Sequence, residues 1–217
     1  MNKSAQHLRL AGLISGGGRT ILNLLDCIDR GELDAELPLV IASRPCSGVR
    51  RLSDRGVNVR VVPYQDMPDV ETYSAAINEL LDSAEPDLVL MGGFLSFWWI
   101  PDRYQGRVMN IHPALLPCFG GKGLYGRRVH EAVLSAGCKV SGCTVHFASN
   151  EYDAGPIVVQ RCVQIEESDT ADSLAERVFQ QERLAYPRAI RLFASDRLRI
   201  EGSVVRILGG DKKVNLD

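Results

Sequence analysis

The 217-residue sequence has almost no net charge and no hydrophobic run long enough to cross a bilayer. Its 25 lysines and arginines nearly balance 27 acidic residues, so the formal net charge is -2. Binding to nucleic acid usually requires a basic patch, and the composition argues against such a partner. The opening "MNKSAQHLRLAGLISGGG" contains an apolar stretch too short for a membrane span and lacks a signal-peptide cleavage pattern. We therefore expect a cytoplasmic protein without nucleic-acid or membrane partners.

Paired cysteines are also missing. No C-x-x-C motif occurs among Cys27, Cys46, Cys118, Cys138, Cys143 and Cys162. Disulfide frameworks and structural zinc sites depend on regular cysteine spacing. Zinc would need three or more convergent ligands, and the four histidines show no spacing that supplies them. The sequence therefore predicts free thiols and no metal.

Strand and helix signals alternate in the first half of the chain. Near-continuous apolar runs, typical of strands buried on both faces, occupy 8–15, 37–43, 57–63 and 86–93. Between them, helical spacing follows the first glycines up to Gly31 and recurs at 48–56 and 69–84. Strand, helix, strand repeated at this pace predicts right-handed crossovers and a mostly parallel sheet.

In the second half of the chain, strand and helix signals no longer alternate regularly. The predicted elements are a strand at 107–113, a helix at 127–136, strands at 138–149 and 156–165, a long helix at 170–195, and a hairpin at 197–208 before a loose tail. Thr170 is the expected N-cap of the long helix, and Pro187 should bend or restart it. The predicted class is α/β, an open, mostly parallel twisted sheet with helices on both faces.

We expect a single domain with two functional halves. The predicted domain covers 1–202, with a phosphate- or nucleotide-binding half at about 8–105 and a second half at about 106–202. Residues 203–217 would form a terminal strand and tail. No internal repeat or low-complexity segment divides the chain.

A glycine turn, "SGGGRT", joins the first strand to the first helix. Gly16, Gly17 and Gly18 permit close backbone approach, and N–H groups at a helix N-terminus favour an anion. Arg19 and Thr20 add a charged donor and a hydroxyl. Tight strand-to-helix packing is the alternative explanation. A dinucleotide fits less well because the third fingerprint glycine is absent, although an arginine after the second strand leaves NADP open.

Asn110 and His112 stand two residues apart in "NIHPALLP", where an apolar strand meets a proline turn. On a regular strand both face the same side, at the carboxyl end where open α/β folds place their chemistry. Histidine changes charge near neutral pH, and an amide can donate to an oxyanion. Asp153 in "NEYDAGP" lies in a turn that could aim its carboxylate at them. A hydrogen-bonded structural corner is the alternative. His146 is expected to be structural, and His130 is expected on a helix face.

The segment 110–160 closely resembles the glycinamide ribonucleotide formyltransferases, folate-dependent transformylases of purine synthesis. The N-I-H-P-x-L-L-P block is followed about forty residues later by T-V-H-F and Y-D-x-G-P, and the resemblance extends from "LISGGG" to "RLFASDRLRI". It implies a Rossmann-like formyltransferase fold with Asn110, His112 and Asp153 as catalytic residues. The implied reaction is direct transfer from 10-formyltetrahydrofolate to a primary amine. Protonated His112 and Asn110 would stabilise the oxyanion, while Asp153 raises the proton affinity of His112.

The resemblance also implies two substrate sites, no metal, small-molecule partners only, and a monomer or homodimer. The glycine turn would hold the acceptor phosphate, and Glu182 would contact ribose hydroxyls. The folate would enter a slot lined by Met91, Leu95, Phe97, Trp98, Val108, Ala148, Ser149, Asn150 and Glu151.

Four positions depart from the family pattern. Many members read "SGxGSN" where this chain has Arg19 and Thr20, and polar residues common elsewhere fall at Val70 and Phe179. Only Arg19 could compensate for the lost polar contacts. A formyltransferase for another amine, such as an amino sugar nucleotide, therefore stays open. So do a formyltetrahydrofolate hydrolase and a non-catalytic nucleotide-binding protein.

Overall fold

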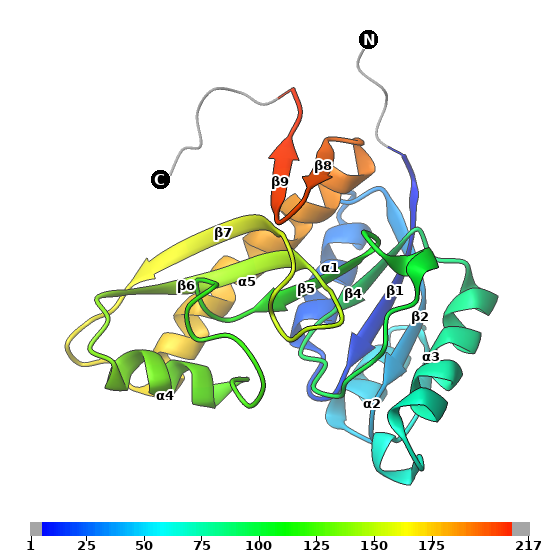
Figure 1. The fold of residues 1–217 in the computed structure, drawn as a ribbon, viewed down its shortest axis with the longest axis horizontal. Coiled ribbons are helices and arrows are strands. Elements are labelled where there is room, and N and C mark those ends of the chain that lie inside the picture. The colour runs from blue at the N-terminus through cyan, green and yellow to red at the C-terminus, as the bar shows by residue number, and fades with distance from the viewer. Residues whose placement is uncertain (1–5, 210–217) are drawn as a thin grey trace.

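The computed structural model describes residues 6–209, which form a nine-stranded sheet flanked by helices (Figure 1). The strand order is β3-β2-β1-β4-β5-β6-β7-β9-β8. The strands β1 to β5 are parallel, and β6 lies antiparallel between β5 and β7. The strands are β1 Leu8–Ile14, β2 Ala35–Ala42, β3 Asn58–Val61, β4 Leu88–Met91, β5 Val108–His112, β6 Val140–Phe147, β7 Ile157–Gln164, β8 Leu198–Glu201 and β9 Val204–Ile207. The predicted mostly parallel α/β sheet is confirmed, while the expected tail lies outside the described residues beyond Gly209.

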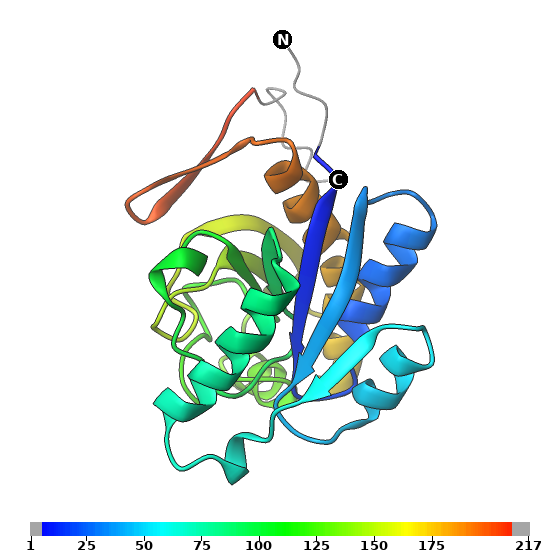
Figure 2. The ribbon, with the colours of Figure 1, turned by 90° about the vertical axis from the view of Figure 1, so that its right-hand side faces the viewer.

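Helices cover both faces of the sheet, and Figure 2 shows α1 and α3 on opposite sides of β1. The helices are α1 Arg19–Asp29, α2 Ser47–Ser53, α3 Val70–Ala84, α4 Arg127–Ser135 and α5 Ala171–Ala194. Helices α1, α2, α4 and α5 bury apolar side chains in one core, whereas α3 packs in the other. Successive residues of β1, Leu10 and Ala11, belong to different cores. Burial on both faces explains the uninterrupted apolar run of this strand.

The long helix α5 begins at the predicted cap and continues through its proline. Thr170 accepts a hydrogen bond from the Ser173 N–H. The predicted restart at Pro187 is wrong. A proline leaves the carbonyl four residues earlier without its helical donor, and here the Asn23 side chain of α1 donates to the Arg183 carbonyl at 3.2 Å. The interrupted backbone bond is thus replaced by a contact between helices.

The carboxyl ends of β4 and β5 meet beneath α5. The buried Tyr186 hydroxyl donates to the Met109 carbonyl at 2.7 Å and lies 3.1 Å from the Met91 carbonyl. The register of β5 and β6 pairs Asn110 with His146. Two sequence motifs 36 residues apart are therefore neighbours at one edge of the core.

Gly155 lies where the backbone passes too close to a neighbouring segment for any side chain. A Cβ there would stand 1.7 Å from the Phe147 carbonyl oxygen. We expect Gly155→Ala to lower the free energy of unfolding by about 3 kcal/mol or more, because backbone must move to admit the methyl group. Denaturant unfolding measures this. Gly16→Ala, which would meet nothing within 4 Å, is the control and should stay within about 0.5 kcal/mol. Equal denaturant concentrations at the unfolding midpoints of Gly155→Ala and Gly16→Ala would contradict the prediction.

Candidate active site

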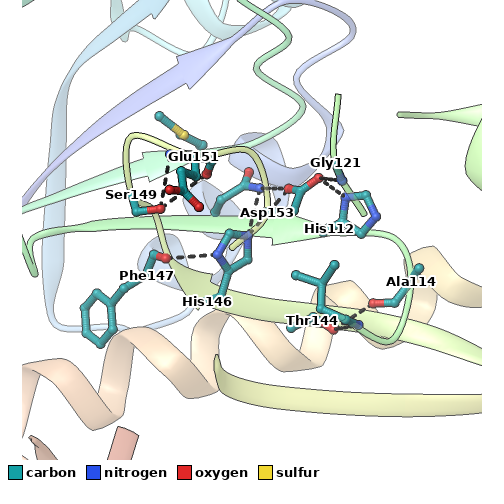
Figure 3. A network of polar contacts seen from close by, with 12 residues as sticks. His112, Ala114, Gly121, Thr144, His146, Phe147, Ser149, Glu151 and Asp153 are labelled. Carbon is teal, nitrogen blue, oxygen red and sulfur yellow. Dashed lines mark hydrogen bonds and ion pairs between the residues drawn. The ribbon is translucent and has the colours of Figure 1, made fainter. Parts of the chain in front are cut away.

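Asn110, His112 and Asp153 converge beside the end of β5. Figure 3 shows the Asp153 carboxylate between the His112 and His146 rings. The Asn110 amide donates to Asp153 Oδ1 at 3.3 Å, and His112 Nδ1 lies 3.4 Å from Asp153 Oδ2. Asp153 comes from the loop between β6 and β7 and has a φ of 54°. A positive φ is unfavourable for a residue with a side chain and marks a backbone held by its surroundings. The surroundings therefore hold this loop in an unfavourable conformation that directs the Asp153 carboxylate toward Asn110 and His112.

His146 belongs to the same network, which the sequence did not predict. Its Nδ1 donates to the Phe147 carbonyl at 2.9 Å. Its Nε2 lies 3.1 Å from the Asn110 amide nitrogen and 3.7 Å from Asp153 Oδ1. His146 is buried and hydrogen-bonded, as expected of a structural histidine, but it also orients Asn110. The evidence for this role is the position of His146 opposite Asn110, which is visible only in the register of β5 and β6.

Both N–H groups of Asn110 are occupied in this geometry. One points to Asp153 and the other to His146. An oxyanion can receive a hydrogen bond from Asn110 only by replacing one of these two partners. The donor role that the sequence predicted for Asn110 stays a prediction.

The glycine-rich loop after β5 is tied down by two of these side chains. His112 Nε2 donates to the Phe119 carbonyl at 2.8 Å, and Gly121 N–H donates to Asp153 Oδ2 at 2.9 Å. A Cβ at Gly120 would stand 2.5 Å from the Leu116 side chain and 3.2 Å from that of Asp153. The absence of a side chain at Gly120 thus lets the loop cover the site closely.

Burial and charge oppose each other in setting the pKa values of this group. Burial lowers the pKa of His112 overall, although the Asp153 carboxylate and the Phe119 carbonyl raise it. For Asp153, burial acts to raise the pKa, but the neighbouring His146 and His112 rings and the Gly121 N–H lower it overall. The pKa of His112 is thus set by burial on one side and by the Asp153 carboxylate on the other, and the protonated His112 of the resemblance stays a prediction.

A cleft of about 590 Å³ opens from these residues toward α1 and α5. Asn110, His112 and Asp153 line one part of it, and the Arg19, Thr20 and Glu182 side chains line another. Burial raises the pKa of Glu182 to about 7, while the nearby Arg19 acts to lower it. The side chains predicted to be catalytic and those predicted to bind the acceptor therefore share one cavity, in which the Glu182 carboxyl group ionises near neutral pH.

The predicted glycine turn is not part of the cleft lining. Gly16, Gly17 and Gly18 lie before α1, where the Gly48 N–H of α2 donates to the Gly16 carbonyl at 3.2 Å. Arg44, the residue that left an NADP site open, donates its Nε to the Ser15 carbonyl at 2.7 Å. The turn and Arg44 thus support the packing of α2 against the sheet. Arg19 and Thr20, which follow the turn, are the residues of this segment that line the cleft.

His130 lies on helix α4, as predicted, and it also lines the same cleft. It is only 3% exposed, and its Nδ1 has no hydrogen-bond partner among the described residues. Burial lowers its pKa, and the proximity of His112 lowers it further. His130 is therefore a neutral ring at the site, a position that helical spacing alone could not distinguish from core packing.

A second, smaller cavity of about 80 Å³ lies on the other side of Asn110 and Asp153. Of the predicted folate residues it is lined by Met91, Phe97, Trp98, Ala148, Ser149 and Glu151. Phe94 and Tyr152, which were not predicted, line both cavities. Asn110 and Asp153 also line both, so these two side chains stand at the junction of the two cavities.

Three predicted folate residues lie elsewhere. Val108 is fully buried in the core beneath the slot, although its carbonyl accepts from the Ala148 N–H at 2.8 Å. Leu95 lines the larger cleft. The Asn150 side chain turns away and bonds both backbone groups of Ile100. Even Trp98, at the slot, is 2% exposed and mainly a core residue. Hydrophobic side chains near a slot serve the core as well, and sequence does not separate the two uses.

The described residues add three further observations. All six cysteines are free thiols, as predicted. Within 6–209, no group of three or more histidine, cysteine or acidic side chains is arranged to hold a metal ion. No helix in that range has the length and apolar character to cross a membrane.

The formyl transferase family matches residues 8–190 of this chain. The chloroplastic phosphoribosylglycinamide formyltransferase of Arabidopsis thaliana is 34% identical over 197 residues, which cover 88% of this chain and 67% of the plant protein. The crystal structure of glycinamide ribonucleotide transformylase 1 from Symbiobacterium toebii has a TM-score of 0.87 and 36% identity, covering 94% of this chain and 96% of that one.

The trifunctional purine biosynthetic protein adenosine-3 of Gallus gallus is 33% identical over 196 residues. These residues are 89% of this chain but 19% of the chicken protein, so the chain spans about a fifth of that relative. The chain belongs to the formyl transferase family, in the branch of the phosphoribosylglycinamide formyltransferases.

Proposed function

We propose that this protein transfers the formyl group of 10-formyltetrahydrofolate to the primary amine of glycinamide ribonucleotide. The observation that carries the proposal is the position of Asn110 and Asp153 at the junction of two cavities. A transfer between two bound molecules needs both reacting atoms in one place, and such a junction supplies it. The similarity to proteins named for this reaction supports the choice of substrates.

The smaller cavity would hold the folate, and the larger cleft would hold the acceptor. In this arrangement the acceptor amine attacks the formyl carbon between them, and the carbonyl oxygen becomes an oxyanion. His112 and one N–H of Asn110 would stabilise that charge. The developing charge also favours protonation of His112, whose pKa is lowered by burial. The ionised Asp153 would stabilise the imidazolium and help pass a proton from the attacking amine to the leaving folate nitrogen.

The acceptor would extend from the catalytic group toward α1 and α5. Its phosphate would lie near Arg19 and Thr20, and its ribose hydroxyls near Glu182. We propose a corresponding division of labour within one domain, residues 1–202. The half at about 8–105 would supply phosphate contacts, and the half at about 106–202 the catalytic group and most of the folate slot.

An acceptor screen tests this proposal. The purified protein is given 10-formyltetrahydrofolate with glycinamide ribonucleotide, with an amino sugar nucleotide, or with no acceptor. Folate release is followed by absorbance and the formylated product by mass spectrometry. We expect rapid release only with glycinamide ribonucleotide. Equal release without an acceptor would identify a hydrolase, and faster transfer to the amino sugar would reassign the acceptor.

The titration of Glu182 gives a second test. A carboxylate accepts hydrogen bonds from ribose hydroxyls, so acceptor affinity should fall as the pH drops through about 7, where Glu182 takes up a proton. We expect the acceptor KM of the wild type to rise more between pH 8 and pH 6 than that of Glu182→Gln. Steady-state kinetics with saturating folate measure this difference. Parallel KM profiles would contradict the role of Glu182.

The same ionisation affects stability. A carboxyl group with a pKa raised on folding contributes stability at low pH, which is lost as the pH rises from its unfolded value toward 7. The melting temperature of Glu182→Gln relative to the wild type should therefore be higher at pH 8 than at pH 5. This measurement is independent of any substrate.

We further propose that the protein works in a reducing compartment, the cytoplasm, as a monomer or a homodimer. Six unpaired thiols support the reducing compartment. Each acceptor-binding and catalytic side chain named above comes from one chain, which is compatible with either assembly. Sedimentation analysis would distinguish them.

A further inference from the structure

Helix α5 holds the Arg19 side chain at the rim of the cleft through two contacts. The Arg19 guanidinium carbon lies 3.8 Å from the centre of the Phe179 ring, and its Nη2 donates to Glu176 Oε2 at 2.6 Å. Arg19 and Phe179 both line the cleft. The other N–H groups of Arg19 have no hydrogen-bond partner in residues 6–209. The guanidinium is thus held in place with donors left for a ligand.

Glu176 is itself fixed by a chain of polar contacts between α1 and α5. Gln180 Nε2 donates to Glu176 Oε1 at 2.8 Å, and Arg183 Nη1 donates to Gln180 Oε1 at 3.2 Å. Arg183 Nε in turn donates to Asn23 Oδ1 on α1 at 3.0 Å. The carboxylate that binds Arg19 therefore has a defined position before any ligand arrives.

We propose that Phe179 is a positioning residue that presents Arg19 to the anionic group of the acceptor and so determines the preference for a phosphorylated acceptor. This inference rests on the proposed function. An arginine side chain in water loses considerable rotamer freedom when it binds a ligand. Stacking on an aromatic ring removes part of that freedom in advance while the planar donors stay available. Phe179 has no polar atom with which to bind an anion, so the proposal assigns its effect on the phosphorylated acceptor to Arg19.

The test compares glycinamide ribonucleotide with its dephosphorylated riboside as acceptors. We expect Phe179→Leu to lower kcat/KM for the phosphorylated acceptor about threefold to fivefold, mainly through KM, and to leave that for the riboside unchanged. Arg19→Ala should lower it about tenfold or more. The double variant should match Arg19→Ala alone, because Phe179 acts through Arg19. Phe179→Tyr keeps the ring and should restore the wild-type preference.

Arg30→Ala removes a partly exposed arginine at the other end of α1 and is the matched control, expected to change neither acceptor. Equal losses on both acceptors in Phe179→Leu would mean that the ring only packs the helices, and would overturn the inference. The inference would also be overturned if the double variant lost more kcat/KM for the phosphorylated acceptor than Arg19→Ala alone, by the factor of the Phe179→Leu loss. A wild type that formylates neither acceptor would instead refute the proposed function, so the two failures are distinguishable.

Discussion

Replacing His112 by alanine is expected to reduce formyl transfer at least about 1,000-fold while folate analogues still bind. The imidazole can gain a proton next to the forming oxyanion, and general acid–base groups typically supply about 10²–10⁴-fold. His112 does not line the smaller cavity, so the substitution should leave the wall of the proposed folate site intact. Single-turnover kinetics measure the loss, and fluorescence titration measures the binding of the analogue.

A suitable control is His7→Ala. This exposed histidine pairs with Asp34 far from the cleft, and its removal should leave transfer unchanged. Since His112 also bonds the Phe119 carbonyl, the melting temperature of both variants should be compared. Near-normal turnover in a folded His112→Ala protein would remove this residue from the mechanism.

Asp153→Asn is expected to lower kcat about 100-fold or more without unfolding the protein. The amide retains an oxygen for the Gly121 N–H, so the loop can stay in place. What is lost is the negative charge that raises the pKa of His112 against the effect of burial. The ring should therefore be harder to protonate, and the transition state should lose electrostatic stabilisation.

The pH profile distinguishes this effect from a simple structural loss. Because Asp153 raises the pKa of His112, its removal should move the apparent pKa of that ring to a lower pH, which NMR titration can follow directly. Asp34→Asn, a change at an exposed carboxylate, should move neither the ring titration nor kcat. An unshifted His112 titration in Asp153→Asn would show that the two side chains are not coupled.

The architecture was predictable because its signals are local. The runs at 8–15 and 37–43 became the parallel strands β1 and β2, and Thr170 began α5. A buried parallel strand must be apolar on both faces, so its sequence identifies it without reference to its neighbours. The helix does not restart at Pro187, because the donor that satisfies the freed Arg183 carbonyl is Asn23 on α1, 160 residues away.

The catalytic residues were predicted only as residue types at a strand end. "NIHP" and "YDAGP" supplied an amide, an imidazole and a carboxylate with suitable chemistry, and family resemblance joined them. Their common partner His146 was placed there by the pairing of β5 with β6, and His130 by the packing of α4 beside the cleft. Neither the strand pairing nor the helix packing produces a periodic pattern in the sequence, because each depends on contacts between two separate elements.

By itself, therefore, the sequence determined which segments become strands and helices, and which side chains could carry acid–base chemistry. Only the tertiary structure decided that Val108 belongs to the core, that Asn110 divides its donors between Asp153 and His146, and that Arg19 rests on Phe179. The physical reason is range: secondary structure follows from neighbours along the chain, whereas burial, pKa and side-chain contacts follow from residues that folding brings together.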